Sequence, residues 1–245
     1  MKTFKLILLA ACFLFMLPKT IQAQENDEFV MNLVEYTVKF GHSSNFEEGV
    51  KKWKKCYQEN NGESKWNLWK REQGKGNTYV VSSRLANWAE MDEDDPAGAA
   101  CTSVAVQFVR PHIENMEVNT VQSMPKLSRK ADMGDATLVW VYSFDVKNSR
   151  AFLNIIEQIT STIQAQEGDK RGYWYRSLAG EGNDYFVSTP YKGFSDLDND
   201  RDNVWEVYEK AHGKTKTEKI RDEFSAVLDN ATSFIYSLQK DLSMQ

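Results

Sequence analysis

The chain has 245 residues, 41% of them hydrophobic and 12% aromatic, and a formal net charge of −5 at pH 7. This hydrophobic content is enough for a sizeable core in one large domain or two small ones. An acidic chain without a basic run does not fit a protein that binds nucleic acid or an anionic membrane surface.

Residues 1–23 have the pattern of a cleaved export signal. Lys2 and Lys5 precede the apolar run LILLAACFLFML, and residues 21–23 (IQA) form a small-residue cleavage site. Two alternatives stay open: an uncleaved anchor, or a lipobox (LAAC) that attaches lipid to Cys12. The run is short for a membrane span, and the chain stays apolar after Cys12. We therefore expect an exported protein, periplasmic or secreted, with no membrane span.

Two long stretches of the chain resemble one another at a spacing of 106 residues. Positions 33–95 match positions 139–201 without a gap, with about a dozen identities. They include the glycines and the asparagine of a Gly-x-Gly-Asn sequence, namely Gly74, Gly76 and Asn77 against Gly180, Gly182 and Asn183. Self-similarity at a fixed spacing predicts a duplicated structural unit.

The first unit begins with an alternating strand at 33–40, followed by a helix whose apolar stripe is Phe46, Val50, Trp53 and Tyr57. Two strands come next, in 65–72 and 78–83. Gly-x-Gly-Asn joins them as a hairpin turn rather than a phosphate loop, because no helix follows the glycines. A helical region at about 97–116 and a closing strand in 117–128 complete the unit.

The second unit repeats this order. It has a strand at 139–146, a helix with the stripe Phe152, Ile156, Ile159 and Ile163, and a hairpin around Gly180 and Gly182. A further helical region precedes a closing strand in 232–243. The spacing to the first unit has grown to 115 residues in the closing strands.

The order β-α-β-β-α-β is that of a ferredoxin-like unit, whose helices cover only one face of its sheet. Two copies in one chain can pack their bare sheet faces together. The sequence therefore predicts an α+β protein with a first repeat at 24–128, a linker at 129–137 and a second repeat at 138–245. We expect a pseudo-dimeric barrel closed within one chain, and so a monomer or a weak oligomer.

Three segments resemble the dimeric α+β barrel superfamily: VKFGHSSNFEEGVKKW (38–53), YVVSS (79–83) and LQKDLS (238–243). That group includes antibiotic-biosynthesis-type monooxygenases, haem-degrading and chlorite-dismutase-type proteins, and NIPSNAP-like and stress-responsive barrel proteins. The resemblance covers nearly the whole chain after residue 23 and implies the fold. Its motifs are structural, and a fold alone does not assign an activity.

The resemblance places His112 where haem-binding members keep an iron ligand. Its helical spacing of four from Phe108 would put both side chains on one face, whereas Pro111 and the equivalent Val227 favour an ordinary core position. We expect no cofactor, with haem as the alternative. Neither an H-E-x-x-H motif nor a Cys/His cluster occurs, so no metal site is expected.

Four aromatic residues from the hairpin strands are the candidate ligand-binding residues, together with His112. If they face the space between the sheets, they line an aromatic cavity for a small hydrophobic or aromatic molecule; the alternative is core packing. These residues are Trp69, Tyr79, Trp174 and Tyr185.

Cys56 and Cys101 lie on predicted helices of the first repeat. They form a disulfide if those helices pack side by side in an oxidising compartment, and otherwise two small buried residues.

No catalytic motif occurs in the sequence. The favoured function is therefore an exported, non-catalytic barrel that binds a small hydrophobic or aromatic ligand or a protein partner. The alternative is a cofactor-poor monooxygenase or a haem-handling enzyme of the same superfamily. A purely structural protein is the third hypothesis.

Overall fold

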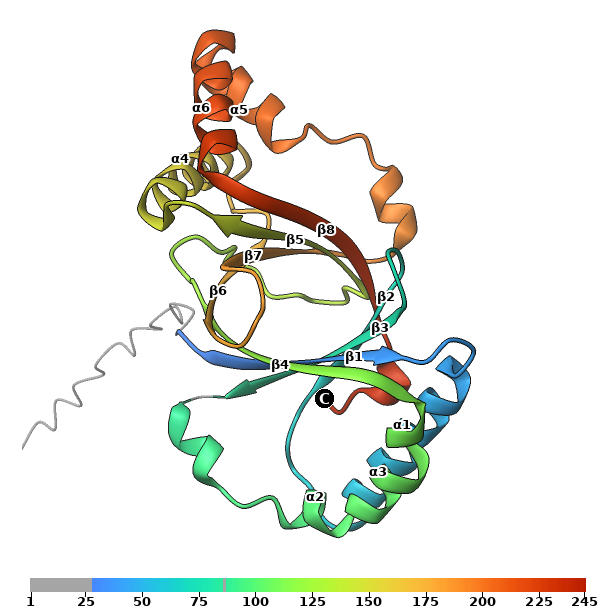
Figure 1. Ribbon diagram of the computed structural model, residues 1–245. Coiled ribbons are helices and arrows are strands. Elements are labelled where there is room, and N and C mark those ends of the chain that lie inside the picture. Colours follow the sequence, from blue (N-terminus) through green and yellow to red (C-terminus); the bar gives the residue numbers. More distant parts are fainter. Residues whose placement is uncertain (1–27, 86) are drawn as a thin grey trace, which may run out of the picture.

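The computed structural model describes residues 28–85 and 87–245. They form a closed barrel of antiparallel strands in the order β1-β3-β2-β8-β5-β7-β6-β4, with helices on its outside (Figure 1). This confirms the predicted α+β class and the pseudo-dimeric barrel. The expected signal peptide at 1–23 lies outside the described residues. Within those residues, no helix has the length and apolar character to cross a membrane.

Each repeat supplies four strands to the barrel. The first consists of β1 (Val30–Val38), α1 (Ser43–Glu59), β2 (Asn67–Arg71), β3 (Asn77–Leu85), α2 (Pro96–Ala100), α3 (Thr102–Phe108) and β4 (Ile113–Ser123). The second consists of β5 (Leu138–Val146), α4 (Ser149–Glu167), β6 (Tyr173–Ala179), β7 (Tyr185–Tyr191), α5 (Val204–His212), α6 (Lys214–Val227) and β8 (Leu228–Leu238). Short 3-10 helices are η1 (Trp88–Asp92), η2 (Arg110–His112), η3 (Phe194–Asp198) and η4 (Lys240–Leu242).

The two repeats join along both of their sheet edges. Strand β2 of the first repeat pairs with β8 of the second, and β4 pairs with β6. Each repeat thus pairs the edges that it would otherwise expose, which removes a site for unwanted strand pairing. The sheets therefore do more than face each other as the sequence predicts: they close into one hydrogen-bonded wall.

The strand register corrects the gapless match between the repeats. Val30 pairs with Leu85, and Leu138 pairs with Tyr191. Leu85 and Tyr191 are 106 residues apart, whereas Val30 and Leu138 are 108 apart. The loop between the first strand and first helix is two residues longer in the first repeat. Because side chains alternate with a period of two, this shift keeps every strand residue on the expected face.

The helical region predicted at 97–116 is broken into shorter pieces. It forms α2, α3 and η2, and β4 begins as early as Ile113. Pro111 accounts for the break, because it has no backbone N–H to donate and disfavours helical backbone at Arg110. The closing strand of the second repeat also starts earlier than predicted, at Leu228.

The apolar core lies between the barrel wall and the helices rather than inside the barrel. Phe46 of α1 and Phe152 of α4 have no exposed surface. Phe46 packs on Tyr79 of β3 with ring centroids 4.9 Å apart, and Phe152 stacks on Tyr185 of β7 at 5.1 Å. These contacts fix one face of each strand outward, which leaves the alternate residues to line the interior.

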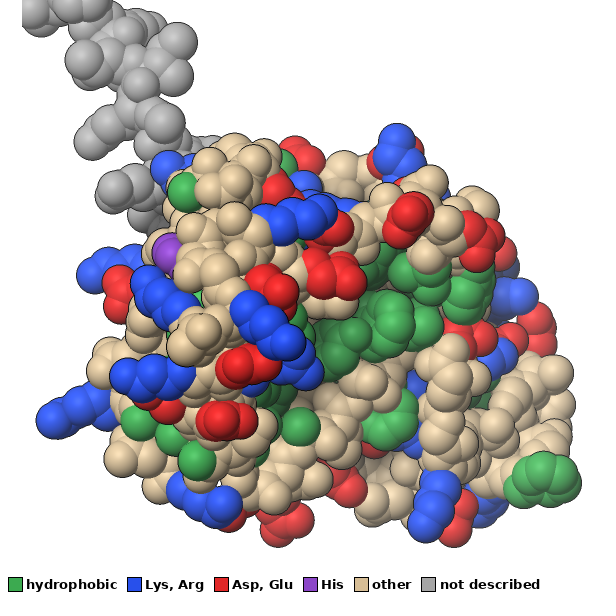
Figure 2. Space-filling view, turned by 90° about the horizontal axis from the view of Figure 1, so that it is seen from above, with side chains coloured by type: hydrophobic (Ala, Val, Ile, Leu, Met, Phe, Trp, Pro, Cys, Tyr) green, Lys and Arg blue, Asp and Glu red, His purple; other side chains and the backbone are tan. Residues whose placement is uncertain are grey.

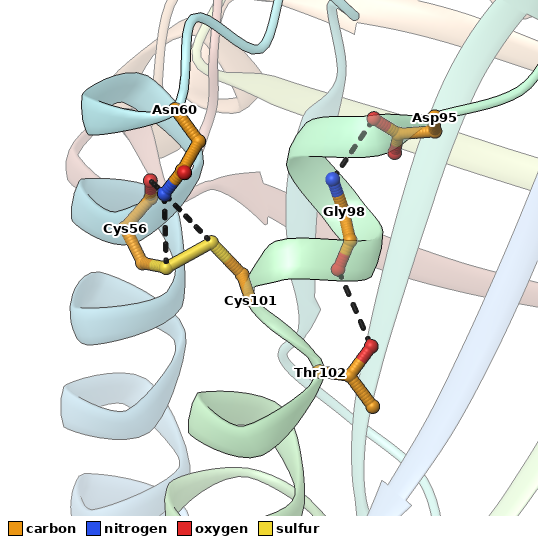
Figure 3. Close-up of a disulfide and its surroundings, with 6 residues drawn as sticks. All are labelled: Cys56, Asn60, Asp95, Gly98, Cys101 and Thr102. Carbon is orange, nitrogen blue, oxygen red and sulfur yellow. Dashed lines mark hydrogen bonds between the residues drawn. A yellow bond between two sulfur atoms is a disulfide. The ribbon is translucent and has the colours of Figure 1, made fainter.

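Cys56 of α1 and Cys101, between α2 and α3, form a disulfide with a Cα–Cα distance of 5.9 Å (Figure 3). The Asn60 side chain donates a hydrogen bond to the Cys56 carbonyl at 2.9 Å and lies over both sulfurs. Asp95 caps α2 by accepting a hydrogen bond from the Gly98 amide at 2.9 Å. The bridge therefore ties the short α2–α3 segment to the long helix α1.

Candidate functional site

The interior of the barrel holds a cavity of about 400 Å³. Alternate residues of all eight strands line it, from Met31, Leu33 and Glu35 on β1 to Thr232, Phe234 and Tyr236 on β8. Barrels of this strand number are either filled by their own side chains or hold one small ligand. The volume lies within the range of small-molecule sites. The cavity is therefore the first candidate for a functional site.

Aromatic side chains form the cavity walls at equivalent positions of the two repeats. Trp69 on β2 corresponds to Tyr175 on β6, 106 residues later, and both line the cavity. The Trp69 indole N–H donates to the Ser82 hydroxyl at 3.1 Å. Tyr175 stacks on Phe186 at 4.7 Å, and burial raises the pKa of its hydroxyl. The walls thus offer neutral, flat surfaces of the kind that planar molecules bind.

Three polar side chains meet on one side of the cavity, from strands that are far apart in the sequence. We call Glu35 of β1, Arg71 of β2 and Tyr236 of β8 the charged pole. Arg71 and Tyr236 are direct cross-strand partners. The Arg71 guanidinium lies 4.7 Å from the centre of the Phe234 ring and donates a hydrogen bond to the carbonyl of Lys75.

The Nε atom of Arg71 is buried and makes no hydrogen bond to any part of the chain that the structure describes. A buried donor without a partner is costly, and native proteins contain few of them. The Arg71 side chain as a whole is only partly buried and borders the cavity, so its other N–H groups are the ones that a ligand can reach.

The charged pole has the pKa pattern of a proton-transfer site. Burial raises the pKa of the Glu35 carboxyl; Arg71 opposes this rise and the neighbouring Glu117 adds to it. Burial and the charge of Glu35 raise the pKa of Tyr236 to about 12, against the opposing influence of Arg71. At neutral pH, Tyr236 thus keeps its proton. The gap between the pH and the pKa is smaller for Glu35 than for an exposed carboxyl group. A carboxyl of this kind can serve as a general base.

The second repeat has no equivalent of the charged pole. With the spacings of 108, 106 and 115 residues for the respective strands, Ser143 corresponds to Glu35, Ser177 to Arg71, and Val121 to Tyr236. All three line the opposite part of the cavity. The cavity is therefore asymmetric: among the described residues that line it, the one carboxyl group and the one guanidinium lie on the same side, whereas the tyrosines lie on both.

Among the predicted ligand-binding residues, Trp69 lines the cavity. Tyr79, Trp174 and Tyr185 lie on the outer face of the wall. The Tyr79 hydroxyl donates to Glu47 at 2.6 Å, and Trp174 stacks on Phe144 at 5.9 Å.

Tyr185 also borders a separate hollow of about 390 Å³ on the outside of the barrel. The four predicted residues therefore do not form one site. The repeat spacing of 106 residues makes Tyr175 the equivalent of Trp69, and because adjacent strand residues point to opposite faces, Trp174 lies on the outer one.

His112 lies on η2, outside the set of residues that line the cavity. Its Nδ1 atom is 2.9 Å from Nδ1 of His42. Burial and the neighbouring His42 and Lys39 lower the pKa of His112, which favours the neutral ring. Because α3 ends at Phe108, His112 is not on the same helix, and the two side chains do not share a helix face. No histidine or cysteine of the described chain lines the cavity, so these residues do not fit haem held through His112.

A second aromatic feature lies on the outer face of β5. Trp140 and Tyr142 stack at 5.5 Å, and 38% of the Tyr142 surface is exposed, so the helices do not cover this part of the sheet as expected. Figure 2 shows hydrophobic side chains gathered in a hollow between charged ones on the side of the molecule that carries α5 and α6. Neither Trp140 nor Tyr142 is a carboxyl group or a cation, so this face is the weaker candidate.

Sequence reasoning did not single out Glu35, which lies on the polar surface of an alternating strand. In a closed barrel, that surface is the interior. The sequence did contain a signal. Arg71 is two residues after Trp69, so the two side chains lie on the same face of the strand. Trp69 was already a candidate for the cavity wall. Among the described residues, no group of three or more His, Cys, Asp or Glu side chains could hold a metal ion.

No family model matches the chain, and no curated protein sequence matches it significantly. Its structure is similar to a "putative monooxygenase" from Lactobacillus acidophilus, with TM-score 0.54, 10% identity and coverage of 89% of this chain and 97% of the other. A protein from Fusobacterium nucleatum with the same description has TM-score 0.52, 14% identity and coverage of 87% and 93%. An "anthrone oxidase-like protein" has TM-score 0.53, 9% identity and coverage of 87% and 92%. The chain thus has the fold of the dimeric α+β barrel superfamily.

A haem-binding protein from Thermus thermophilus is also similar, with TM-score 0.47 and 10% identity over 88% of this chain and 93% of the other, a likeness too weak to assign a cofactor.

These comparisons correct the expectation of a non-catalytic protein. The similar structures are described as monooxygenases and an oxidase-like protein, which favours the enzyme alternative. The earlier expectation rested on the absence of a local catalytic motif, whereas Glu35, Arg71 and Tyr236 come together only through the fold.

Proposed function

We propose that the protein is a cofactor-independent monooxygenase that oxidises a planar aromatic substrate with O₂ inside the barrel cavity. The observation that carries this proposal is the charged pole: a carboxyl group with a raised pKa stands beside a cation and a neutral phenol in an aromatic-walled cavity. The oxidase and monooxygenase descriptions of the similar structures support the same class of reaction.

In this mechanism, Glu35 is the general base. It removes a proton from an acidic ring carbon, such as the CH₂ group of an anthrone-type substrate, and the negative charge spreads onto the substrate oxygen. Arg71 and the Tyr236 hydroxyl stabilise that oxygen through charge and hydrogen bonding. The electron-rich carbanion reduces O₂ directly. One oxygen atom forms the new C=O group, the other leaves as water, and the two hydrogens of the CH₂ group end in that water.

The substrate itself supplies the electrons in this reaction, so no step needs a bound cofactor. The protein has to exclude water from the carbanion and hold the ring in one orientation. Trp69, Tyr175 and Phe186 suit that task because they present flat apolar surfaces around the cavity.

The test is oxygen uptake with anthrone as substrate, measured for the wild type, Glu35→Gln and Glu117→Gln. Glu117 is the cross-strand neighbour of Glu35 and is exposed, so its variant is the matched control. Loss of a general base should lower the rate by about 10²- to 10⁴-fold. Glu117→Gln should stay within about threefold of the wild type. A wild type no faster than buffer, or a fully active Glu35→Gln, would refute the proposal.

We also propose that the protein is exported and that residues 1–23 are removed. The Cys56–Cys101 disulfide supports this, because such bonds persist mainly in oxidising compartments. Mass spectrometry of the protein recovered from its native host should find Gln24 as the first residue. Retention of Met1, or a lipid on Cys12, would contradict the proposal.

A further inference from the structure

We infer that the substrate is an aromatic acid, whose ionised carboxylate binds Arg71 while its ring lies in the cavity beside Trp69 and Tyr175. That this ligand is the substrate rests on the proposed function. Its binding can be tested separately, without measuring turnover.

Arg71 lacks a full set of partners for a partly buried cation. Its guanidinium lies over the Phe234 ring, donates to the Lys75 carbonyl and interacts with the Tyr236 hydroxyl. Burying a cation is costly unless an anion and hydrogen-bond acceptors compensate it. A ligand carboxylate would supply acceptors for the remaining accessible N–H groups, and it matches the planar guanidinium best.

Glu35 does not fill this role for Arg71. It is the only acidic residue among those that line the cavity, yet no hydrogen bond joins it to Arg71 among the described residues. Its raised pKa also shows that burial outweighs the attraction of Arg71. Arg71 therefore has no carboxylate of the described chain bound to it, and an anionic ligand group would fill that role.

The composition of the remaining wall sets the orientation of the ligand. Among the described residues, Arg71 is the only cation that lines the cavity, so only one carboxylate can be held in this way. The opposite side presents neutral polar groups, among them Ser143, Ser177 and Asn119. These hydroxyl and amide groups suit further phenol or carbonyl oxygens at the far edge of the ring. The carboxylate should therefore point to the first repeat, beside the substrate oxygen that Arg71 and Tyr236 stabilise, and any further uncharged oxygens to the second.

The experiment compares two probes of nearly equal shape by isothermal titration calorimetry: 2-naphthoate and naphthalen-2-ylmethanol. The proteins are the wild type, Arg71→Met and the matched control Lys75→Met, which removes an exposed positive charge close to Arg71 but outside the cavity lining. The wild type should bind the acid about 10- to 100-fold more tightly than the alcohol, as a hydrogen-bonded charge pair implies. Arg71→Met should lose this preference with little change for the alcohol, and Lys75→Met should keep it.

Equal affinity of the wild type for the two probes would overturn the inference, as would a preference that survives in Arg71→Met. If Arg71→Met does not fold, the wild-type comparison still decides, and Arg71→Lys, which keeps the charge but lacks the Nε donor, replaces it with an expected intermediate preference. No oxygen is consumed in this assay. Acid binding without oxygen uptake would therefore refute the proposed function alone, and oxygen uptake without acid preference would refute this inference alone.

Discussion

Glu35 and Arg71 of the first repeat occupy the same wall positions as Ser143 and Ser177 of the second. Both repeats supply alternate residues of four strands to one cavity, and both place an aromatic residue in the middle of it, Trp69 in one and Tyr175 in the other. In a homodimeric barrel, two-fold symmetry would force any charge to appear twice. Joining the two copies in one chain releases that constraint. The duplicated wall can then hold one base and one cation on a single side.

The outer layers of the two repeats differ in a parallel way. In the first repeat, Cys56 of α1 is bonded covalently to Cys101. The equivalent of Cys56 in α4 is Thr162, whose hydroxyl lies 2.9 Å from Nε2 of His212 on α5. One helix layer is thus held by a covalent bond and the other by a hydrogen bond and apolar packing. The two repeats should therefore differ both in stability and in chemistry.

The largest expected effect is the loss of the disulfide. The double substitution Cys56→Ser and Cys101→Ser opens a loop spanning 45 residues in sequence, and chain entropy predicts a loss of about 4 kcal/mol of unfolding free energy. In the second repeat, Thr162→Val removes only the hydrogen bonds of this hydroxyl, to the Gln158 carbonyl and to His212, and should cost about 1 to 2 kcal/mol. Urea denaturation of both proteins measures the difference. Equal losses would mean that the bridge does not distinguish the two helix layers.

The two hairpin turns should respond differently to an added methyl group. Gly180 has φ +108°, and a Cβ atom there would lie 2.1 Å from Oδ1 of Asn119 and 2.8 Å from the Val118 carbonyl oxygen. Gly76 has φ +73° with its nearest neighbour at 3.4 Å. Gly180→Ala should therefore cost about 2 kcal/mol or more, and Gly76→Ala about 1 kcal/mol. Thermal unfolding ranks them, and the reverse order would show that the hairpin of the second repeat tolerates the crowding.

The charged pole should also show in the pH dependence of stability. Burial raises the pKa of Glu35 above its unfolded value of 4.5, so the folded state holds this proton more tightly than the unfolded state. The ionised carboxyl thus costs stability, and this cost appears as pH rises from about 4.5 through the folded pKa. Glu35→Gln should unfold at a higher temperature than the wild type at pH 8, with the gain gone at pH 4. Glu117→Gln is the control, and an equal gain from it would locate the effect outside the cavity.

The smallest expected effect concerns His112. Its ring contacts His42 outside the cavity, so His112→Ala should leave any interaction with haem unchanged. Titration with hemin at micromolar concentration should give no saturable Soret band in either protein. A sharp band that disappears only in His112→Ala would make haem the cofactor and His112 its ligand. A band lost instead in Tyr236→Phe would place haem at the charged pole.

The sequence predicts the strands and helices of this barrel better than the side chains that line its cavity. The duplicated strand and helix patterns indicate two ferredoxin-like units, because the apolar stripe of Phe46 and its repeat at Phe152 is a local signal. Edge pairing between β2 and β8 is not local, and nothing in either strand alone predicts it. Until the barrel is closed, Glu35 reads as a polar residue on an open sheet. The same closure converts it into a buried carboxyl.

The candidate site depends on the register of the strands to a single residue. Trp69 lines the cavity, whereas the candidate Trp174 lies one residue away from the equivalent position, Tyr175. A one-residue difference in a strand moves a side chain to the opposite face. Pro111 is a second local cause of error: it stops the helical region early and moves His112 out of any helix. Patterns within single strands and helices were therefore sufficient to predict the fold, whereas the site depends on how the strands are aligned with one another.

A crystal structure of the protein with 2-naphthoate tests the central claim most directly, because it shows where an aromatic acid binds. Our account predicts the naphthalene ring inside the barrel beside Trp69 and Tyr175, with a carboxylate oxygen within hydrogen-bond distance of the Arg71 guanidinium. A naphthoate stacked on Trp140 and Tyr142 at the outer face of β5, with the barrel cavity free of it, would contradict that account.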